Sequence, residues 1–291
     1  MTTLETSNIS KYFSLVRISH TIFSLPFALI GFFLAFKFVG GNFPIRSLFL
    51  VLLSVFFARN AAMGFNRYAD REFDKKNPRT ALREIPRAII KPKSAMLFVI
   101  LNAGLFILCT YFLNLLCLFL SPLALLVVLG YSLTKRFTAL SHVFLGLGLS
   151  LAPIGAYLAI TARFDLLPLL FSFMVIFWVA GFDILYALLD IEFDKSENLK
   201  SLPVFLGKRN ALVLSGIFHS ITLILVVVAG WLGQFHLIYW IGAILFALLL
   251  LYEHVIVKPS DISRVNLTFT TLNGAASVLY ACFVIADLLL Y

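Results

Sequence analysis

Residues 66–74 of this 291-residue chain read NRYADREFD, and they follow a long apolar run and open the most charged segment of the sequence. Asn66, Asp70 and Asp74 are four residues apart in turn. Each such step along an α-helix turns about 40° past a full circle, so the three side chains share one helical face. The pattern predicts a row of one amide and two carboxylates where an apolar segment ends.

A second acidic row lies much further along the chain. Asp183, Asp190 and Asp194 are separated by steps of seven and four residues, which again place three carboxylates on one helical stripe. Tyr186 lies between the first two of them. This row also stands at the end of an apolar segment, so the chain carries two similar acidic rows that require an explanation.

The composition places the chain in a membrane. It is 61% hydrophobic and 13% charged, with a mean hydropathy of +1.00, whereas a soluble domain is about 25% charged. Several runs of about twenty apolar residues recur with short breaks, and each is long enough to cross the hydrocarbon core of a bilayer. We therefore expect an all-α polytopic membrane protein that contacts lipid.

The apolar runs predict nine transmembrane helices in a single domain over residues 1–291, preceded by a short cytoplasmic segment at 1–14. The breaks that separate the third span from the fourth, at Asn114, and the fifth from the sixth, at Arg163 to Asp165, decide the count. The predicted spans are 16–37, 46–67, 95–113, 115–134, 142–162, 166–187, 210–231, 236–256 and 265–289.

The distribution of basic residues predicts the orientation of these spans. With the N-terminus in the cytoplasm, only Lys37, Arg46 and Arg163 fall in outside loops, and the other Lys and Arg residues lie inside or near the inner face. Positive charge is enriched in cytoplasmic loops, so this orientation is favoured and both acidic rows end on the cytoplasmic side. The net charge of +9 reflects this topology, and we expect no nucleic-acid partner.

The acidic rows and the basic loops that follow them predict a site for Mg²⁺ and a diphosphate. Ionisable side chains at membrane depth are costly and are usually functional. Carboxylates that face one vestibule repel one another unless a cation lies between them, and Mg²⁺ is commonly bound by one or two carboxylates together with substrate phosphates. The neighbouring Arg and Lys side chains suit phosphate oxygens.

At this point the sequence resembles the UbiA superfamily of intramembrane prenyltransferases over nearly its whole length. Asn66, Asp70 and Asp74 match the first motif, N-x-x-x-D-x-x-x-D. In the 4-hydroxybenzoate branch this motif continues through R-T and R-P-x-P, and Glu84 departs from that pattern because it replaces the usual proline. The matching residues of the continuation are Arg79, Thr80, Arg83 and Pro86.

Two further stretches carry the resemblance. Residues 183–194 match the second motif of that branch, D-x-x-Y-A-x-x-D-x-x-x-D, and Lys200 and Ser201 follow it. Residues 131–138, YSLTKRFT, resemble the branch pattern Y-x-x-x-K-R-x-T. The resemblance implies nine transmembrane helices around a central cavity, and Mg²⁺-dependent transfer of a polyprenyl group from polyprenyl diphosphate to a small aromatic acid in quinone biosynthesis.

The resemblance also implies roles for individual residues. Arg59, seven residues before Asn66, matches an arginine on the acceptor side, and Asp183 and Tyr186 would lie near the reacting carbon or the acceptor. The implied diphosphate-binding residues are Tyr131, Lys135, Arg79, Arg83 and Lys200. The implied Mg²⁺ ligands are Asn66, Asp70, Asp74, Asp190 and Asp194.

Several alternatives remain open from the sequence. The stretch 77–81, NPRTA, also resembles prenyltransferases of the menaquinone pathway that act on futalosine-derived acids, and the superfamily includes naphthoate prenyltransferases, haem O synthases and chlorophyll synthases. A secondary transporter is the rival from another class, although its charges are expected near the midplane of the membrane. We expect a multi-pass protein of the bacterial cytoplasmic membrane with its active site facing the cytoplasm.

Overall fold

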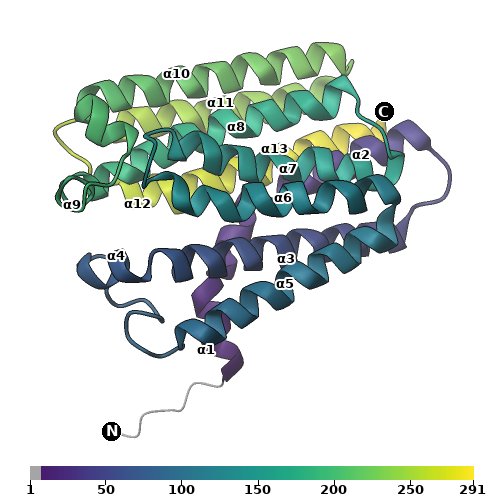
Figure 1. Ribbon diagram of the computed structural model, residues 1–291. Helices are drawn as coiled ribbons and strands as arrows, with labels where there is room; N and C mark the ends of the chain where they lie inside the picture. Colours follow the sequence, from purple (N-terminus) through teal and green to yellow (C-terminus); the bar gives the residue numbers. More distant parts are fainter. Residues whose placement is uncertain (1–7) are drawn as a thin grey trace, which may run out of the picture.

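The computed structural model describes residues 8–291, most of which lie in α-helices that run side by side (Figure 1). Residues 1–7 of the segment expected at 1–14 lie outside the described residues. The long helices are α2 (Leu25–Val39), α3 (Ile45–Ala69), α5 (Pro92–Leu113), α6 (Leu115–Thr134), α7 (Ser141–Thr161), α8 (Leu166–Ala187), α10 (Leu202–Leu232), α11 (Leu237–Ile256) and α13 (Asn273–Leu290). The short elements are α1 (Asn8–Val16), α4 (Arg71–Lys76), α9 (Ile191–Ser196), α12 (Val265–Leu267), the 3₁₀ turns η1 (Ile18–Phe23) and η2 (Leu188–Asp190), and the π-turn η3 (Thr268–Leu272).

The number of spans agrees with the sequence. Among the described residues, eight helices are long and apolar enough to cross a membrane, or nine if Lys11–Phe23 and Leu25–Val39 form one bent span. Both decisive breaks are present. Asn114 caps α6 by accepting a 2.9 Å hydrogen bond from the amide of Cys117, and residues 163–165 lie between α7 and α8.

The first span differs from the single helix expected at 16–37, because the chain bends by 50° between η1 and α2. Pro26 explains the bend: it has no N–H to donate, and in a continuous helix its ring would clash with the carbonyl of Ile22. That carbonyl instead accepts a 2.8 Å hydrogen bond from the Ser277 hydroxyl. The bend is therefore compensated by a bond to α13.

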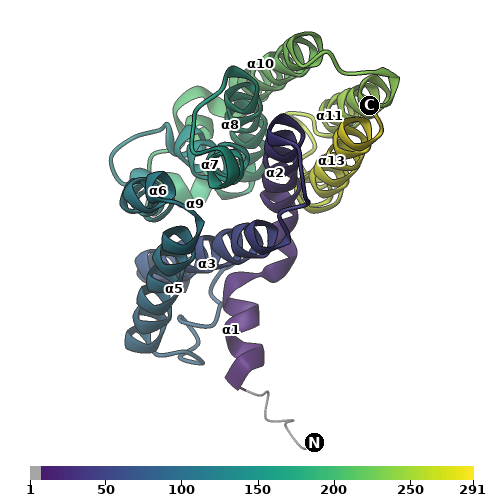
Figure 2. The ribbon, with the colours of Figure 1, turned by 90° about the vertical axis from the view of Figure 1, so that its right-hand side faces the viewer.

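Close helix contacts bring the bundle together around α7. Viewed from the end of the bundle (Figure 2), α7 lies in the interior, and it packs against α2, α6 and α8. A Cβ atom on Gly31 of α2 would lie 2.0 Å from the Pro153 carbonyl oxygen, and one on Gly146 of α7 would lie 2.4 Å from the Ile176 carbonyl oxygen. Glycine at these positions lets the helix backbones approach each other.

The last span is interrupted beside the interior of the bundle. The π-turn η3 precedes α13, whose first residue, Asn273, accepts a 2.9 Å hydrogen bond from Trp178 Nε1 and donates at 3.0 Å to Glu253 Oε1. The Phe269 ring of η3 stacks on Tyr186 with 4.1 Å between ring centroids. Inter-helix hydrogen bonds thus hold the turn that places an aromatic ring beside the second acidic row.

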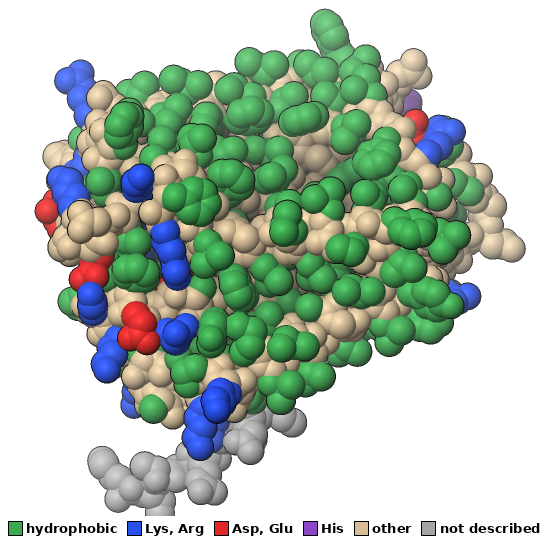
Figure 3. All heavy atoms as spheres, in the orientation of Figure 1, with side chains coloured by type: hydrophobic (Ala, Val, Ile, Leu, Met, Phe, Trp, Pro, Cys, Tyr) green, Lys and Arg blue, Asp and Glu red, His purple; other side chains and the backbone are tan. Residues whose placement is uncertain are grey.

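The surface is divided as expected for a membrane protein. Figure 3 shows apolar side chains over most of one face of the molecule, while basic and acidic side chains gather toward the end that carries α4 and α9. Both acidic rows lie at this end, because α4 and α9 contain their last members, Asp74 and Asp194. The cytoplasmic orientation of this end stays a prediction.

Candidate active site

The first acidic row persists although the helix that carries it breaks. α3 ends at Ala69 and α4 begins at Arg71, with Asp70 between them at φ −90° and ψ 4°. The Asp70 amide still donates to the Asn66 carbonyl at 2.9 Å, and the Asp74 amide to the Asp70 carbonyl at 2.7 Å. The side chains of Asn66, Asp70 and Asp74 therefore stay in one row and line a common cavity.

The second acidic row spans three elements. Asp183 lies in the last turns of α8, Asp190 closes η2 and Asp194 lies in α9. All three line the same cavity as the first row. Asp183 Oδ2 lies 2.7 Å from Nδ1 of His142, a fully buried residue in the first turn of α7. The structure thus brings both rows to one site.

The loop after α4 connects the two rows. Arg79 forms a two-pronged ion pair with Asp190, with Nε 3.0 Å from Oδ1 and Nη2 against Oδ2, and its Nη1 donates to the Tyr186 hydroxyl at 2.7 Å. Asn77 Nδ2 also donates to Asp190 Oδ1, at 3.1 Å. Arg83 Nη1 donates to Asp74 Oδ1 at 2.6 Å. Each row is therefore neutralised in part by an arginine of this loop.

The cavity has a volume of about 710 Å³ and combines a charged end with apolar walls. The walls are formed by α3, α5, α6, α7 and α8, and they extend away from the charged end to Leu113 at the end of α5 and to Phe164 in the connection between α7 and α8. Acidic and basic side chains are equal in number at the charged end. They are Asp70, Asp74, Asp183, Asp190, Asp194, Arg59, Arg79, Arg83, Lys135 and Arg136.

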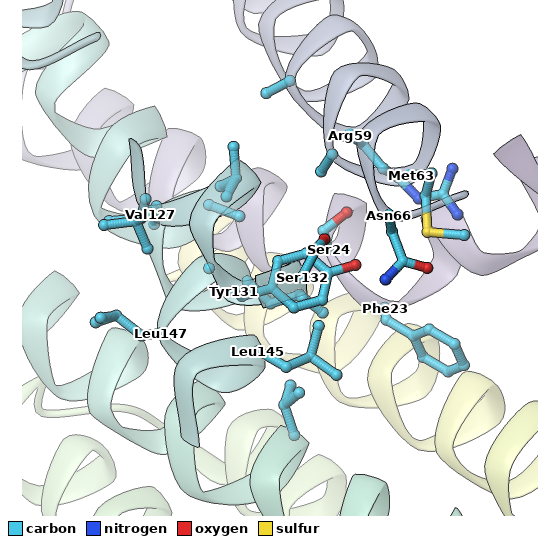
Figure 4. A pocket seen from close by; sticks show the side chains of 18 of the residues that line it. Phe23, Ser24, Arg59, Met63, Asn66, Val127, Tyr131, Ser132, Leu145 and Leu147 are labelled. Carbon is cyan, nitrogen blue, oxygen red and sulfur yellow. The ribbon is translucent and has the colours of Figure 1, made fainter. Parts of the chain in front are cut away.

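Tyr131 and Asn66 project into the same part of the cavity from α6 and α3 (Figure 4). Arg59, which lies seven residues before Asn66 in α3, also lines the cavity. Its guanidinium donates to the carbonyls of Val16 at 3.1 Å and Arg17 at 2.9 Å. Because these partners are neutral, the positive charge of Arg59 remains available to an anionic ligand.

The charge of the first row depends on pH. Burial, and then the negative charge of Asp74, raise the pKa of Asp70 to about 6. A carboxyl with a raised pKa gains most from a nearby cation, since the cation removes the penalty of its ionised form. Asp70 is thus suited to bind a cation when it ionises.

The donor set fits a hard dication. Asp74 Oδ2 and Asp194 Oδ2 are buried oxygens with no hydrogen-bond partner among the described residues. Lys135 Nζ lies 3.7 Å from the latter oxygen. Within residues 8–291 no three His, Cys, Asp or Glu side chains converge on one point, and Asp190 and Asp74 are paired with Arg79 and Arg83. Carboxylate and amide oxygens are the ligands that Mg²⁺ prefers, so these residues fit such an ion.

Lys200 is the exception among the residues to which the resemblance gives a role in the site, since the others all line the cavity. Its Nζ donates to the carbonyl of Phe137 at 3.2 Å, and its amide donates to the carbonyl of Lys135 at 2.7 Å. In this conformation Lys200 fastens the loop after α9 to the loop after α6. Its role at the diphosphate stays a prediction.

Sequence reasoning missed two polar neighbours of the acidic rows. His142 was one of five scattered histidines, and only the fold shows that it contacts Asp183. Asn77, which bonds Asp190, is the first residue of the NPRTA stretch at 77–81, but that resemblance implied no role for it.

Comparison with known proteins decides the family. The model of the UbiA prenyltransferase family matches residues 24–277, which include both acidic rows and the basic loops. The chain belongs to the UbiA prenyltransferase family. It is an enzyme of this family, and this assignment sets aside the secondary transporter that the sequence left open.

Individual relatives agree with this membership. The UbiA chain is 28% identical over 244 residues to a 4-hydroxybenzoate octaprenyltransferase of Tolumonas auensis, covering 84% of this chain and 85% of that one. A UbiA homologue from Aeropyrum pernix K1, solved in its apo form, shares 32% identity with a TM-score of 0.84, over 93% of this chain and 98% of that one.

A more distant structure of the UbiA fold contains ligands. It is a UbiA homologue from Archaeoglobus fulgidus bound to GPP and Mg²⁺, with 22% identity and a TM-score of 0.72, over 95% of this chain and 99% of that one. At this identity the likeness establishes the shared fold.

Proposed function

We propose that this UbiA-family enzyme transfers a polyprenyl group from polyprenyl diphosphate to a small aromatic acid resembling 4-hydroxybenzoate, in a Mg²⁺-dependent reaction that releases diphosphate. One observation carries the proposal. Two carboxylate rows, each paired with an arginine of the same loop, lie at one end of an apolar cavity of about 710 Å³. The relative from Tolumonas auensis is named a 4-hydroxybenzoate octaprenyltransferase, and the GPP and Mg²⁺ bound to the distant homologue are consistent with such a transfer.

The charged end would hold the diphosphate. Asn66, Asp70, Asp74, Asp190 and Asp194 are the proposed Mg²⁺ ligands, and the bound ions would neutralise the departing diphosphate. If Mg²⁺ occupied these carboxylates, Arg79 and Arg83, which are paired with Asp190 and Asp74 in the structure, would be free to bind phosphate oxygens. Lys135, Tyr131 and Lys200 complete the proposed diphosphate site.

The apolar walls would hold the prenyl chain and keep water away. When the bond between the first prenyl carbon and the diphosphate oxygen breaks, an allylic cation develops, and exclusion of water protects it from hydrolysis. The Tyr186 and Phe269 rings both line the cavity and stack with 4.1 Å between their centroids, and the Arg79 guanidinium lies over the Tyr186 ring, 4.8 Å from its centroid. If Arg79 moves to a phosphate, the face of Tyr186 that it covers would be open to stabilise a nearby cation.

The acceptor would bind between Arg59 and Asp183. The Arg59 guanidinium, whose hydrogen-bond partners are neutral carbonyls, suits the acceptor carboxylate. Asp183, oriented by His142, is placed to accept a proton. A ring carbon of the acceptor forms a bond to the first prenyl carbon, and the proton on that ring carbon is then lost. We propose that Asp183, Tyr186 and Arg59 serve this step.

The proposal extends to the setting of the enzyme. We propose that residues 1–291 act as a single domain in the bacterial cytoplasmic membrane, with the charged end facing the cytoplasm, where diphosphate would leave. The strong excess of basic residues on the loops at that end supports this orientation.

Pyrophosphate release from membranes that contain the chain tests the function. The assay supplies geranyl diphosphate, 4-hydroxybenzoate and Mg²⁺, and compares the wild type with Asp70→Ala, Asp190→Ala and, as a control, the exposed Asp261→Ala. We expect release that needs Mg²⁺, acceptor and both site aspartates but not Asp261. Release only with a naphthoate or a futalosine-derived acid would change the acceptor. If folded protein released no pyrophosphate with any acceptor or prenyl length, this result would contradict the proposed transfer.

A further inference from the structure

A second cavity lies beside the active site and is rich in arginine. Its volume is about 370 Å³. Arg79 and Arg83 line both cavities, so these two side chains form the partition between them. The residues that line the second cavity are Phe13, Ser14, Arg17, Arg67, Arg79, Leu82, Arg83 and Glu84.

Arg67 is the least expected of these residues. It lies near the end of α3, and only 5% of it is exposed. Its guanidinium has no hydrogen-bond or ion-pair partner among the described residues. The charged groups that act most strongly on Arg67 are the guanidiniums of Arg83 and Arg17 and the carboxylate of Asp74. Asp74 is already paired with Arg83. A buried charge without a partner is costly, so Arg67 requires a counterion.

The other groups of the second cavity do not supply this counterion. Arg79 and Arg83 are engaged with Asp190 and Asp74 on the side of the first cavity, and Arg83 Nε is buried without a partner. Glu84 is the one carboxylate among the lining residues, and it accepts a hydrogen bond from the Ser14 hydroxyl at the cavity edge. The lining therefore carries four arginines against one acid.

We propose that the second cavity binds a phosphate-type oxyanion, with Arg67 as its central ligand and Arg17 and Arg83 at its sides. Guanidinium groups match the oxygens of phosphate in pairs. The volume accommodates an inorganic diphosphate, and the walls are polar where the first cavity is apolar. This site lies on the other side of Arg79 and Arg83 from the proposed Mg²⁺–diphosphate site and shares Arg83 with it, but its existence does not depend on the transfer reaction.

Calorimetric titration of the full chain with inorganic pyrophosphate tests the site. The protein is held in phosphatidylcholine nanodiscs with EDTA, so that no metal ion can bridge pyrophosphate to the carboxylates of the first cavity, while Arg79 and Arg83 stay paired with Asp190 and Asp74. We expect binding that weakens about tenfold or more in Arg67→Gln, since a hydrogen bond to a charged group is lost. Arg17→Gln is expected to weaken it too, and the control Arg87→Gln, an exposed arginine of the same loop, is expected to leave it unchanged.

A second arm distinguishes a free oxyanion from a lipid headgroup. If pyrophosphate does not bind but phosphatidylglycerol nanodiscs raise the unfolding temperature of the wild type and not of Arg67→Gln, the oxyanion is the headgroup phosphate. Arg67→Gln removes an unpaired buried charge and is expected to fold, and the exposed Arg17→Gln serves if it does not. Pyrophosphate binding that is equal in wild type and both variants, or no effect of either ligand, overturns the proposal.

Discussion

Arg83 Nη1 lies 2.6 Å from Asp74 Oδ1. An arginine proposed to bind diphosphate is therefore paired with a carboxylate proposed to bind the metal ion. Arg79 and Asp190 stand in the same relationship across the two halves of the chain. These ion pairs hold the acidic rows when no dication is bound. Binding of Mg²⁺ and diphosphate would exchange them for carboxylate–metal and arginine–phosphate contacts.

Removal of Arg83 is expected to have opposite effects on the two ligands. In Arg83→Gln, Asp74 loses its competing cation, so the affinity for Mg²⁺ alone should rise. The affinity for a prenyl thiodiphosphate in the presence of Mg²⁺ should fall about tenfold or more, because a charged hydrogen bond is lost. Calorimetry measures both constants. Weaker binding of both ligands would contradict the exchange, and Arg87→Gln is the matched control.

Asp70 is expected to make Mg²⁺ binding sensitive to pH. Burial and Asp74 raise the pKa of Asp70 from 3.8 to about 6, and Mg²⁺ requires the ionised form. Below about pH 6 the affinity for Mg²⁺ should therefore fall by up to about tenfold per pH unit, since one proton competes with the metal. Titration of Mg²⁺ at pH values from about one unit below this pKa to about one unit above it measures this slope.

The same raised pKa predicts how metal-free stability varies with pH. The folded state favours protonated Asp70, so this stabilisation is complete below about 3.8 and is lost as the pH rises through about 6. Between pH 5 and 7 the unfolding temperature of the protein in EDTA should decline more steeply than that of Asp70→Asn, whose amide does not titrate. Parallel curves for the two proteins would show that Asp70 has no raised pKa.

His142 is expected to position Asp183 without binding substrate. Its Nδ1 is 2.7 Å from Asp183 Oδ2, and its ring is fully buried. In His142→Phe the carboxylate loses its orientation, so kcat should fall about tenfold or more while KM for the prenyl diphosphate changes little. His142→Gln, which can still donate a hydrogen bond, should recover part of the loss. An equal loss of kcat in both variants would indicate a role in packing alone.

Gly31 is expected to be required for helix packing. A Cβ at this position would lie 2.0 Å from the Pro153 carbonyl oxygen, so Gly31→Ala must force α2 away from α7 at a cost of about 1–3 kcal/mol. Gly104→Ala in α5 is the matched control, because no atom lies within 4 Å of its added Cβ. There the helix should gain up to about 1 kcal/mol. Thermal unfolding of both variants in detergent checks the contrast.

The sequence predicted features that depend on local periodicity. Apolar runs of bilayer length gave the spans and the breaks at Asn114 and residues 163–165, since crossing a membrane requires length and hydrophobicity in one continuous segment. Four-residue steps placed Asn66, Asp70 and Asp74 in one row. The i to i+4 hydrogen bonds that keep this row together are local, and they survive the break between α3 and α4.

Tertiary structure alone decided which of these features meet. The pairing of Arg79 with Asp190 joins residues 111 positions apart, and that of His142 with Asp183 joins two helices. Lys200 follows the second motif as expected but turns to a backbone carbonyl. Arg67, in the last turn of α3, has no spacing that distinguishes it from the arginines of the loop after α4, and its burial beside a second cavity appears only in the fold. Periodicity fixes the face of one helix, whereas packing between helices selects the partner of each charge.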